Sequence, residues 1–567
     1  MKNVPVIRYT LFLLLSYFSV VFKAEATPWR SSLYPYNWQP GTKDQSGRFL
    51  HDFSYAGYRK GEVAIPINPP GLTYNVFTGF GADPYGKYNS TPEIQAAINA
   101  ASSAGGGIVY IPPGYYKIDG ELVVTSSKVV IRGAGPTLTK LRFSSTPSSL
   151  AHIGFYGNAL SGPELFLAQD AENLSTMIKI QNASSLRVGD DISIGWKITD
   201  NFIDEHKMSG IWSIRRDFWW PIFQRKIVAI NTRVTPNVVY IDIPIRYNVK
   251  TRDFASIRKV TGYLEESGIE NLGISNVTSY VKAWTKNGVT AIVLSSVKNG
   301  WVKNIKSFSP PEDKSQLYHL QSTGIKVEYS KNVTVTNSQM EGSQNRGANA
   351  NGYLFKITNS NEILIRDSAG FRGRHNFIQS GDFGTTGCVF LRVDSRDSRG
   401  FQSVMDAVGM PYFSEYHHSL AMANLVDQST LYDGWLAYNR GMESSGSGHT
   451  SSQNVFWNTK NGTILSYQYG YGYVIGTTNT SVSINASSAL SHYAKDTSPV
   501  DFIEGIGQGA GLIPQSLYED QLTQRLVRLR NAPVMENPNN NGLQNAVRFK
   551  NTDTGSIPSS NIRSKGL

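Results

Sequence analysis

The sequence predicts an all-β fold in which short parallel strands stack coil upon coil into a solenoid. Long amphipathic helical patterns are almost absent from the 567 residues, whereas short β-branched runs recur along the chain. Six runs, each opened by Asn, Gly or Ser, begin at residues 268, 299, 330, 360, 387 and 452. One strand pattern per repeat, without a crossover helix, is typical of a parallel β-solenoid.

The spacing of these runs supports the same fold. The apolar positions taken as equivalent are Leu272, Val302, Val333, Ile363 and Val389. Successive steps between them are 30, 31, 30 and 26 residues. A β-propeller repeats at about 40 residues with four strands in each blade, so these coils are too short for a propeller.

The chain begins with a segment typical of a secretory signal peptide, over residues 1–26. Lys2 and Arg8 precede an apolar run at 10–22, and Ala24-Glu25-Ala26 offers a small-residue cleavage site. No stretch approaches the about 20 apolar residues that a membrane-spanning helix needs. We therefore expect a secreted, extracellular protein without a membrane span, and eight Asn-x-Ser/Thr sequons suit a glycoprotein.

Two helices stand out from the β-rich pattern. The first is expected at 90–107, with Ser90 or Thr91 as its cap, Pro92 in its first turn and Gly105 to Gly107 at its end. We expect it to cap the first coil, whose edge would otherwise expose unpaired backbone groups. The second is a C-terminal helix over 513–530, where leucines recur at roughly helical spacing.

The remaining chain divides by composition. An N-terminal segment with the capping helix and first coils occupies 27–170, and the main coils occupy 266–512. Between them, residues 171–265 are rich in Trp and alternate over longer, antiparallel-style strands, which predicts a β-rich insertion packed on the solenoid. Residues 531–567 are rich in Asn, Ser and Pro with few apolar residues, which predicts a flexible tail.

Charge and cysteine usage limit the choice of function. The net charge of +11 includes +5 from residues 525–567. The rest of the chain is only weakly basic, so its charge is compatible with an anionic substrate but does not by itself predict one. Cys388 is the only cysteine, so no intramolecular disulfide forms, and its alternating apolar surroundings predict a buried, inert thiol. No Cys/His spacing typical of a metal site occurs, and we expect no nucleic-acid partner.

One stretch carries a specific resemblance. Residues 75–135 contain "STPEIQAAINAASSAGGGIVYIPPGYYKI", a helix followed by a glycine-rich strand start. This stretch resembles the N-terminal signature of the secreted pectate-lyase-like superfamily, which includes polysaccharide lyases and polygalacturonases. The family's usual G-D-G before the helix is replaced here by "ADPYGKYNST". The resemblance implies a right-handed parallel β-helix, with a helix capping its open end, and a carbohydrate substrate.

Four of the nine histidines lie within 75 residues that span about three coils. They are His375, His417, His418 and His449. Residues one coil apart stack about 4.8 Å from each other, so distant residues converge on one wall. Because side chains alternate along a strand, we expect His418 to face a groove and His417 to turn inward or hold the turn by a hydrogen bond.

This group suits β-elimination from a uronate-containing polysaccharide. Arg374 and Arg440 would neutralise the substrate carboxylate, and His418 would abstract the C5 proton. His375 or His449 would donate a proton or orient the base. The residues expected to bind substrate are His417, Arg372, Arg399, Asp406, Tyr467 and Tyr469, the last two on one face of a tyrosine-rich strand.

Several alternatives remain open. Ca²⁺ is possible, with Asp394, Asp397 and Asp406 as candidate ligands, but no tight acidic cluster is visible and the metal is unknown. A polygalacturonase-like hydrolase would need paired carboxylates, and the pair Asp190 and Asp191 is interpreted as structural. A non-catalytic carbohydrate-binding or structural β-helix is the third reading. The preferred prediction is a polysaccharide lyase acting on an anionic polysaccharide.

Overall fold

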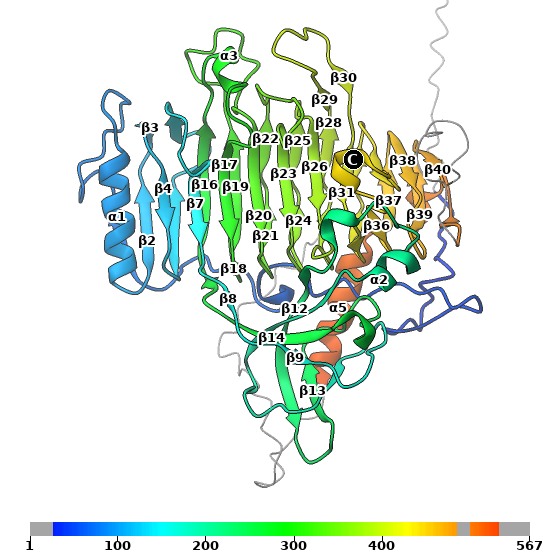
Figure 1. The fold of residues 1–567 in the computed structure, drawn as a ribbon. Helices are drawn as coiled ribbons and strands as arrows, with labels where there is room; N and C mark the ends of the chain where they lie inside the picture. The colour runs from blue at the N-terminus through cyan, green and yellow to red at the C-terminus, as the bar shows by residue number, and fades with distance from the viewer. Residues whose placement is uncertain (1–25, 485–498, 532–567) are drawn as a thin grey trace, which may run out of the picture.

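The computed structural model describes residues 26–484 and 499–531. The expected signal peptide and the expected tail lie almost entirely outside these ranges. Within them, parallel strands stack into one long solenoid, so the predicted all-β parallel β-helix is confirmed (Figure 1).

One wall of the solenoid is a ten-stranded parallel sheet, to which each coil contributes one strand. In spatial order its strands are β4 (Leu122–Val124), β7 (Ala151–Tyr156), β17 (Thr290–Ser295), β20 (Thr323–Glu328), β23 (Tyr353–Thr358), β26 (His375–Ser380), β31 (Ser414–His418), β35 (Trp435–Ala437), β38 (Thr463–Ser466) and β40 (Ser481–Ser483).

The other walls belong to an eighteen-stranded sheet that bends into two limbs. The first limb holds β1 (Leu72–Asn75), β2 (Gly107–Ile111), β5 (Val129–Gly133), β16 (Gly268–Ser275), β19 (Trp301–Ser307), β21 (Thr334–Thr336), β24 (Leu364–Arg366), β27 (Val389–Leu391), β33 (Leu425–Asp427), β37 (Val455–Lys460), β39 (Tyr473–Thr478) and β41 (Phe502–Glu504). The second holds β3 (Gly114–Ile118), β6 (Thr139–Phe143), β22 (Gln339–Glu341), β25 (Ala369–Phe371), β28 (Asp394–Arg396) and β34 (Thr430–Leu431).

The register differs in detail from the expected repeat. Val302 pairs with Val335 rather than Val333, and Leu272 pairs with Ile305 rather than Val302. Val389 pairs with Leu364, one residue from the expected Ile363. The loops between coils differ in length, so a strand with several apolar residues fits more than one register until the loop fixes it.

The interior of the solenoid is a continuous apolar column. Val335, Ile365, Phe390 and Val426 stack in register on consecutive coils and are buried. The polar residues that open each strand form a second column at the turns. There the backbone N–H of Ser330 donates to Ser360 Oγ at 3.1 Å, and that of Asn424 donates to Asn454 Oδ1 at 2.8 Å. These bonds satisfy buried turn groups, which explains the recurrent Asn and Ser.

Helix α1 (Thr91–Ser103) covers one end of the row of strands, as expected (Figure 1). Its face of Ile94, Ala97, Ile98 and Ala101 is buried against the first coil. Burying this face also shields the exposed edge of the solenoid.

The β-rich insertion is an antiparallel sheet that begins at Leu160, before the expected residue 171. Its elements are β8 (Leu160–Ser161), β9 (Leu165–Phe166), β10 (Met177–Ile180), β11 (Asp191–Lys197), α2 (Asp200–Glu205), β12 (Trp219–Asn231), β13 (Asn237–Ile241) and β14 (Ser256–Thr261). Asp191 joins it to the solenoid, since its carboxylate lies 2.7 Å from Nζ of both Lys298 and Lys331. Trp212 is buried where the insertion packs on the solenoid, and its indole N–H donates to the carbonyl of Ser447 at 3.0 Å.

The outer side of the eighteen-stranded sheet is covered by the N-terminal segment and by α5 (Leu517–Asn531). Tyr34, Trp38 and Phe53 share an apolar cluster with Leu364 and Leu425. Cys388 is buried in the interior, where burial raises its pKa and keeps the thiol protonated. Across the described ranges, no helix has the length and apolar character to cross a membrane.

Candidate active site

The paired histidines lie at the end of strand β31, and both face outward. Tyr416 points into the core, but the register shifts between Gln379 and Ser380 of the neighbouring strand, so that His418 pairs with Ser380. The rings of His417 and His418 are 4.6 Å apart. The expectation that they face opposite ways is therefore wrong, because this β-bulge adds one residue and breaks the alternation.

His417 belongs to a buried ionic cluster with Glu415, Arg440 and His375. One carboxylate oxygen of Glu415 contacts His417 Nδ1, lies 2.9 Å from the Arg440 guanidinium and 3.6 Å from His375 Nε2. Burial alone would raise the pKa of Glu415, but its interactions with His375, Arg440 and His417 outweigh burial and lower the pKa well below its ordinary value. Burial lowers the pKa of His375 to about 4 and that of His417 to about 3, so both are neutral near pH 7.

His418 is the histidine of this group that solvent reaches, with 23 % of its side chain exposed. Its Nδ1 lies 3.4 Å from Asp382 Oδ1 and 3.2 Å from the Arg215 guanidinium. Because both contacts use Nδ1, Nε2 lies on the far side of the ring. Burial raises the pKa of Asp382, but hydrogen bonding to His418 and the charges of His418 and Arg215 lower it to about 2. With the ring proton on Nδ1 and donated to Asp382, Nε2 is unprotonated, as a general base requires, and the Arg215 guanidinium is then held by Asp382 at 3.1 Å.

Two lysines lie on the same outer wall, on the coils before His418. Lys326 of β20 pairs with Lys356 of β23. Lys356 pairs with Ile378, which in turn pairs with Glu415, so the two lysines point to the same face of the sheet as Glu415. Lys326 is paired with Glu328. Burial, with the nearby charge of Lys326, lowers the pKa of Lys356 to about 8. Lys356 therefore lies on the same wall as His418, two strands away, and the charge of Asp382 acts on it.

Other predicted catalytic residues lie elsewhere or are already paired. His449 is fully buried between the insertion and the solenoid, with its ring 5.0 Å from that of Tyr469 and 6.4 Å from that of Trp212. Its expected place on the groove wall is wrong, because the insertion covers this part of the coil. Arg374 donates to the carbonyl of Gly347 at 3.1 Å, and its guanidinium lies 4.9 Å from the Tyr412 ring.

The predicted substrate-binding residues are dispersed. Arg372 pairs with Glu341 at 2.8 Å, and Arg399 donates to the carbonyl of Val408 at 3.3 Å. Asp406 accepts backbone N–H groups of its own loop, such as that of Gly409 at 2.9 Å. These polar groups therefore serve local structure.

The tyrosines expected on one strand face lie in a connection before β39. Tyr467 is buried and bonded to Ser483 Oγ at 2.8 Å. Tyr469 donates to the carbonyl of Glu205 at 2.9 Å and packs on the insertion, with its ring 4.4 Å from that of His206. The expectation of one exposed tyrosine face is wrong, since the residues before Tyr473 do not form a strand.

One group of potential metal ligands occurs within the described ranges, namely His375, Glu415 and His417. Two imidazoles and one carboxylate do not suit Ca²⁺, which prefers six to eight oxygen ligands. The Arg440 guanidinium already supplies positive charge to this carboxylate. Of the aspartates considered for Ca²⁺, Asp394 pairs with Arg396 at 2.5 Å and Asp406 caps its own loop.

The sequence reasoning missed Arg215, Asp382, Lys326 and Lys356. The two lysines occupy corresponding positions in consecutive coils, "GIKVE" and "LFKIT", so correct register would have found them. Arg215 reaches His418 from the insertion, and no periodic signal could have placed it there.

Known proteins match parts of this chain. Residues 73–192 match the family model "Rhamnogalacturonase A/epimerase, pectate lyase-like". Alginate lyase 7 of Azotobacter vinelandii is 44% identical over 78 residues, which cover 12% of this chain and 9% of that protein. Mannuronan C5-epimerase AlgE3 of the same organism is 34% identical over 119 residues, 19% of this chain and 6% of that protein. The match therefore spans less than a tenth of each relative's length.

Solved structures that are similar to this chain include the tailspike protein gp49 from Pseudomonas phage LKA1. It has 15% sequence identity and a TM-score of 0.46, and the match covers 72% of this chain and 64% of that one. The gp54 tailspike of Acinetobacter baumannii bacteriophage AP22, solved with a capsular saccharide, has 14% identity and a TM-score of 0.44, covering 77% and 69%. The parallel sheets described above make this chain a parallel β-helix protein, and its first coils are similar to the pectate-lyase-like family.

Proposed function

We propose that this protein cleaves a uronate-containing polysaccharide by β-elimination, with His418 as the base. The observation that carries the proposal is the pairing of His418 Nδ1 with Asp382 on an outer wall that also presents Lys326 and Lys356. A histidine oriented by a carboxylate can remove a proton near neutral pH. Neighbouring cations stabilise the negative charge that develops on the uronate.

The reaction follows from this arrangement. The ammonium group of Lys356 faces the substrate carboxylate and offsets its charge, which makes the C5 proton more acidic. His418 Nε2 takes that proton, the freed electron pair forms the C4–C5 double bond, and the C4–O bond breaks. The departing oxygen takes up a proton from water and becomes the new chain end. Asp382 holds the imidazole and stabilises its protonated form.

This assignment gives the arginines a different role from the one expected. Arg440 is bound to Glu415 and Glu443, so its charge is already compensated inside the protein. Lys356 forms no ion pair with any residue in the described ranges, and it lies on the same outer wall as Glu415. Lys356 therefore replaces Arg374 and Arg440 as the proposed carboxylate partner, while Arg440, His375 and His417 form the buried ionic cluster around Glu415 of strand β31.

The substrate and location are part of the proposal. The names of the relatives, an alginate lyase and mannuronan epimerases, favour mannuronate or guluronate polymers as the first substrates to test. The signal-like segment at 1–26 and the polymeric substrate support export to the cell exterior.

A second candidate function is C5 epimerisation of the same kind of polymer. The match to mannuronan C5-epimerases over 119 residues favours it. Both reactions begin with removal of the C5 proton, and an epimerase then returns a proton to the opposite face of the ring. A hydrolase is less well supported, because Glu415 and Asp382 are each held by cations and Asp191 fastens the insertion.

The test is incubation with polymannuronate, polyguluronate and polygalacturonate, with and without a chelator. Ultraviolet absorbance of the unsaturated product reports β-elimination, and proton NMR of the polymer reports inversion at C5. We expect unsaturated product from at least one polymer, and retention of the rate with chelator. New reducing ends without unsaturation would contradict the lyase assignment, and loss of the rate on chelation would show that a cation is needed.

A further inference from the structure

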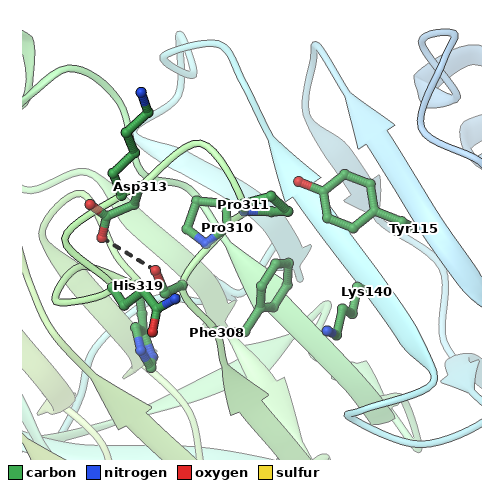
Figure 2. A pocket seen from close by; sticks show the side chains of 10 residues that line it. Tyr115, Lys140, Phe308, Pro310, Pro311, Asp313 and His319 are labelled. Atoms are coloured by element: carbon green, nitrogen blue, oxygen red, sulfur yellow. Dashed lines mark hydrogen bonds between the residues drawn. The ribbon is translucent and has the colours of Figure 1, made fainter.

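A separate pocket lies near the N-terminal end of the solenoid, on the second limb of the eighteen-stranded sheet. Its volume is about 410 Å³, and its floor comes from Tyr115 of β3 and Lys140 of β6. Its wall is the loop that follows β19, including Phe308, Pro310 and Pro311. Figure 2 shows these side chains around one shared space, with His319 at another side.

The pocket contains a fixed aromatic surface. The ring of Phe308 lies 6.2 Å from that of Tyr115 in an edge-on arrangement. Gly273 lies beneath Phe308, and a Cβ there would come within 3.2 Å of the ring and 2.6 Å of the carbonyl of Pro136. A glycine at this position therefore lets the ring lie close to the sheet. Aromatic rings on such a rigid surface provide apolar contact for the face of a sugar ring.

The charge of the pocket is positive. Lys140 Nζ lies 5.4 Å from the centre of the Phe308 ring, and neither Lys140 nor Lys314 forms an ion pair with any residue of 26–484 or 499–531. The Asp313 carboxylate is used by its own loop, where it accepts from Tyr318 N at 2.9 Å and from Ser315 Oγ at 2.6 Å. The nearby Glu312 is paired with Arg142. The two lysines therefore remain available to an anion.

We propose that this pocket binds an acidic sugar residue of the polysaccharide and tethers the polymer away from His418. The pocket lies on a different wall, because His418 belongs to the ten-stranded sheet and Tyr115, Lys140 and Phe308 to the eighteen-stranded one. The choice of an acidic glycan rests on the proposed function, whereas the pocket's aromatic and cationic character does not. A tether of this kind raises the local concentration of polymer without taking part in the reaction.

The test uses the full chain with His418→Ala, so that bound glycan is not consumed. Calorimetric binding of oligomannuronate and oligogalacturonate is compared with that of a neutral oligosaccharide of equal length. We expect Phe308→Ala to weaken binding of the acidic oligosaccharide by about 3- to 10-fold, as loss of one aromatic contact does. Lys140→Met, which keeps the apolar stem, should weaken it and reduce its salt dependence.

Tyr36→Ala is the matched control, because Tyr36 is 84% exposed and carries Arg30 over its ring at 4.3 Å but lies outside the pocket. Unchanged binding in Phe308→Ala and Lys140→Met, or equal binding of the neutral oligosaccharide, would overturn the proposal. Binding that depends on Phe308 in a protein with no lyase or epimerase activity would support the pocket and refute the proposed function. Cleavage of the polymer by a protein whose binding does not depend on Phe308 would support the proposed function and refute the role of the pocket.

Discussion

At the scale of single residues, Lys356 predicts how binding should depend on pH. Burial beside Lys326 lowers the pKa of Lys356 to about 8, so the side chain is cationic below that pH and neutral above it. If its ammonium group binds the uronate, KM should rise as the pH increases through about 8. Lys356→Arg should keep KM low at higher pH, because a guanidinium stays protonated. A wild-type KM that is flat through this range would contradict the assignment.

Asp382 is a positioning residue rather than a reacting group, and its removal should affect turnover more than binding. Asp382→Asn keeps the size of the side chain but loses the charge beside His418 Nδ1. We expect kcat to fall by about 10-fold or more, but by less than the 10²- to 10⁴-fold typical of losing a general base. KM should change little. Equal changes in kcat and KM would indicate a disturbed groove instead.

The two histidines at the end of β31 show where residue-level prediction from sequence reached its limit. Alternation along a strand predicts opposite faces, and the bulge at this position overrides it. Correct alignment of the strands in consecutive coils would have shown that Lys326 and Lys356 occupy equivalent positions. The contact of Arg215 with His418 depends on how the insertion docks, which no local pattern encodes.

At the scale of elements, Asp427 of β33 fastens the start of helix α5. Its carboxylate accepts from Tyr518 N at 2.8 Å and from Ser516 Oγ at 2.7 Å. Asp427→Ala should lower the free energy of unfolding by about 0.5–2 kcal/mol, as loss of a helix cap does. Asp427→Asn should cost less, because its amide oxygen still accepts. Thermal unfolding of the three proteins measures the difference.

Burial raises the pKa of Asp427 to about 7, which fixes the sign of a pH effect. The folded state holds this proton more tightly than the unfolded state, whose carboxyl has a pKa of about 3.9. The contribution of this group to stability is therefore complete below about pH 4 and is lost as the pH rises through about 7. Asp427→Asn should flatten this part of the stability profile. A profile that matches the wild type would contradict the argument.

At the scale of the whole molecule, Asp191 should decide whether the insertion stays docked on the solenoid. Lys331, which it contacts, is buried, and removal of one partner of a buried ion pair costs about 3–5 kcal/mol. We expect Asp191→Ala to lower the melting temperature and to expose residues 160–261 to limited proteolysis. Asp190→Ala is the control, because Asp190 pairs with Lys259 inside the insertion. Equal protease resistance of the two variants would contradict this role.

The fold as a whole was more predictable from sequence than the candidate site. Repeated β-branched runs and the capping pattern at 90–107 follow from local periodicity, and the solenoid follows from their repetition. The site depends on loop lengths that set register and on the insertion that buries His449 and delivers Arg215. These are long-range effects, so the histidine group was identified and His418 was placed on the outer face, whereas His417 and His449 were assigned to the wrong sides.

The most direct test of the central claim compares wild-type protein with His418→Ala on a uronate polymer, with circular dichroism confirming that both are folded. The measured quantity is the rate at which unsaturated product forms. We predict that the wild type forms this product and that His418→Ala loses about 10²- to 10⁴-fold in rate. A folded His418→Ala variant that keeps the wild-type rate would show that another group removes the C5 proton.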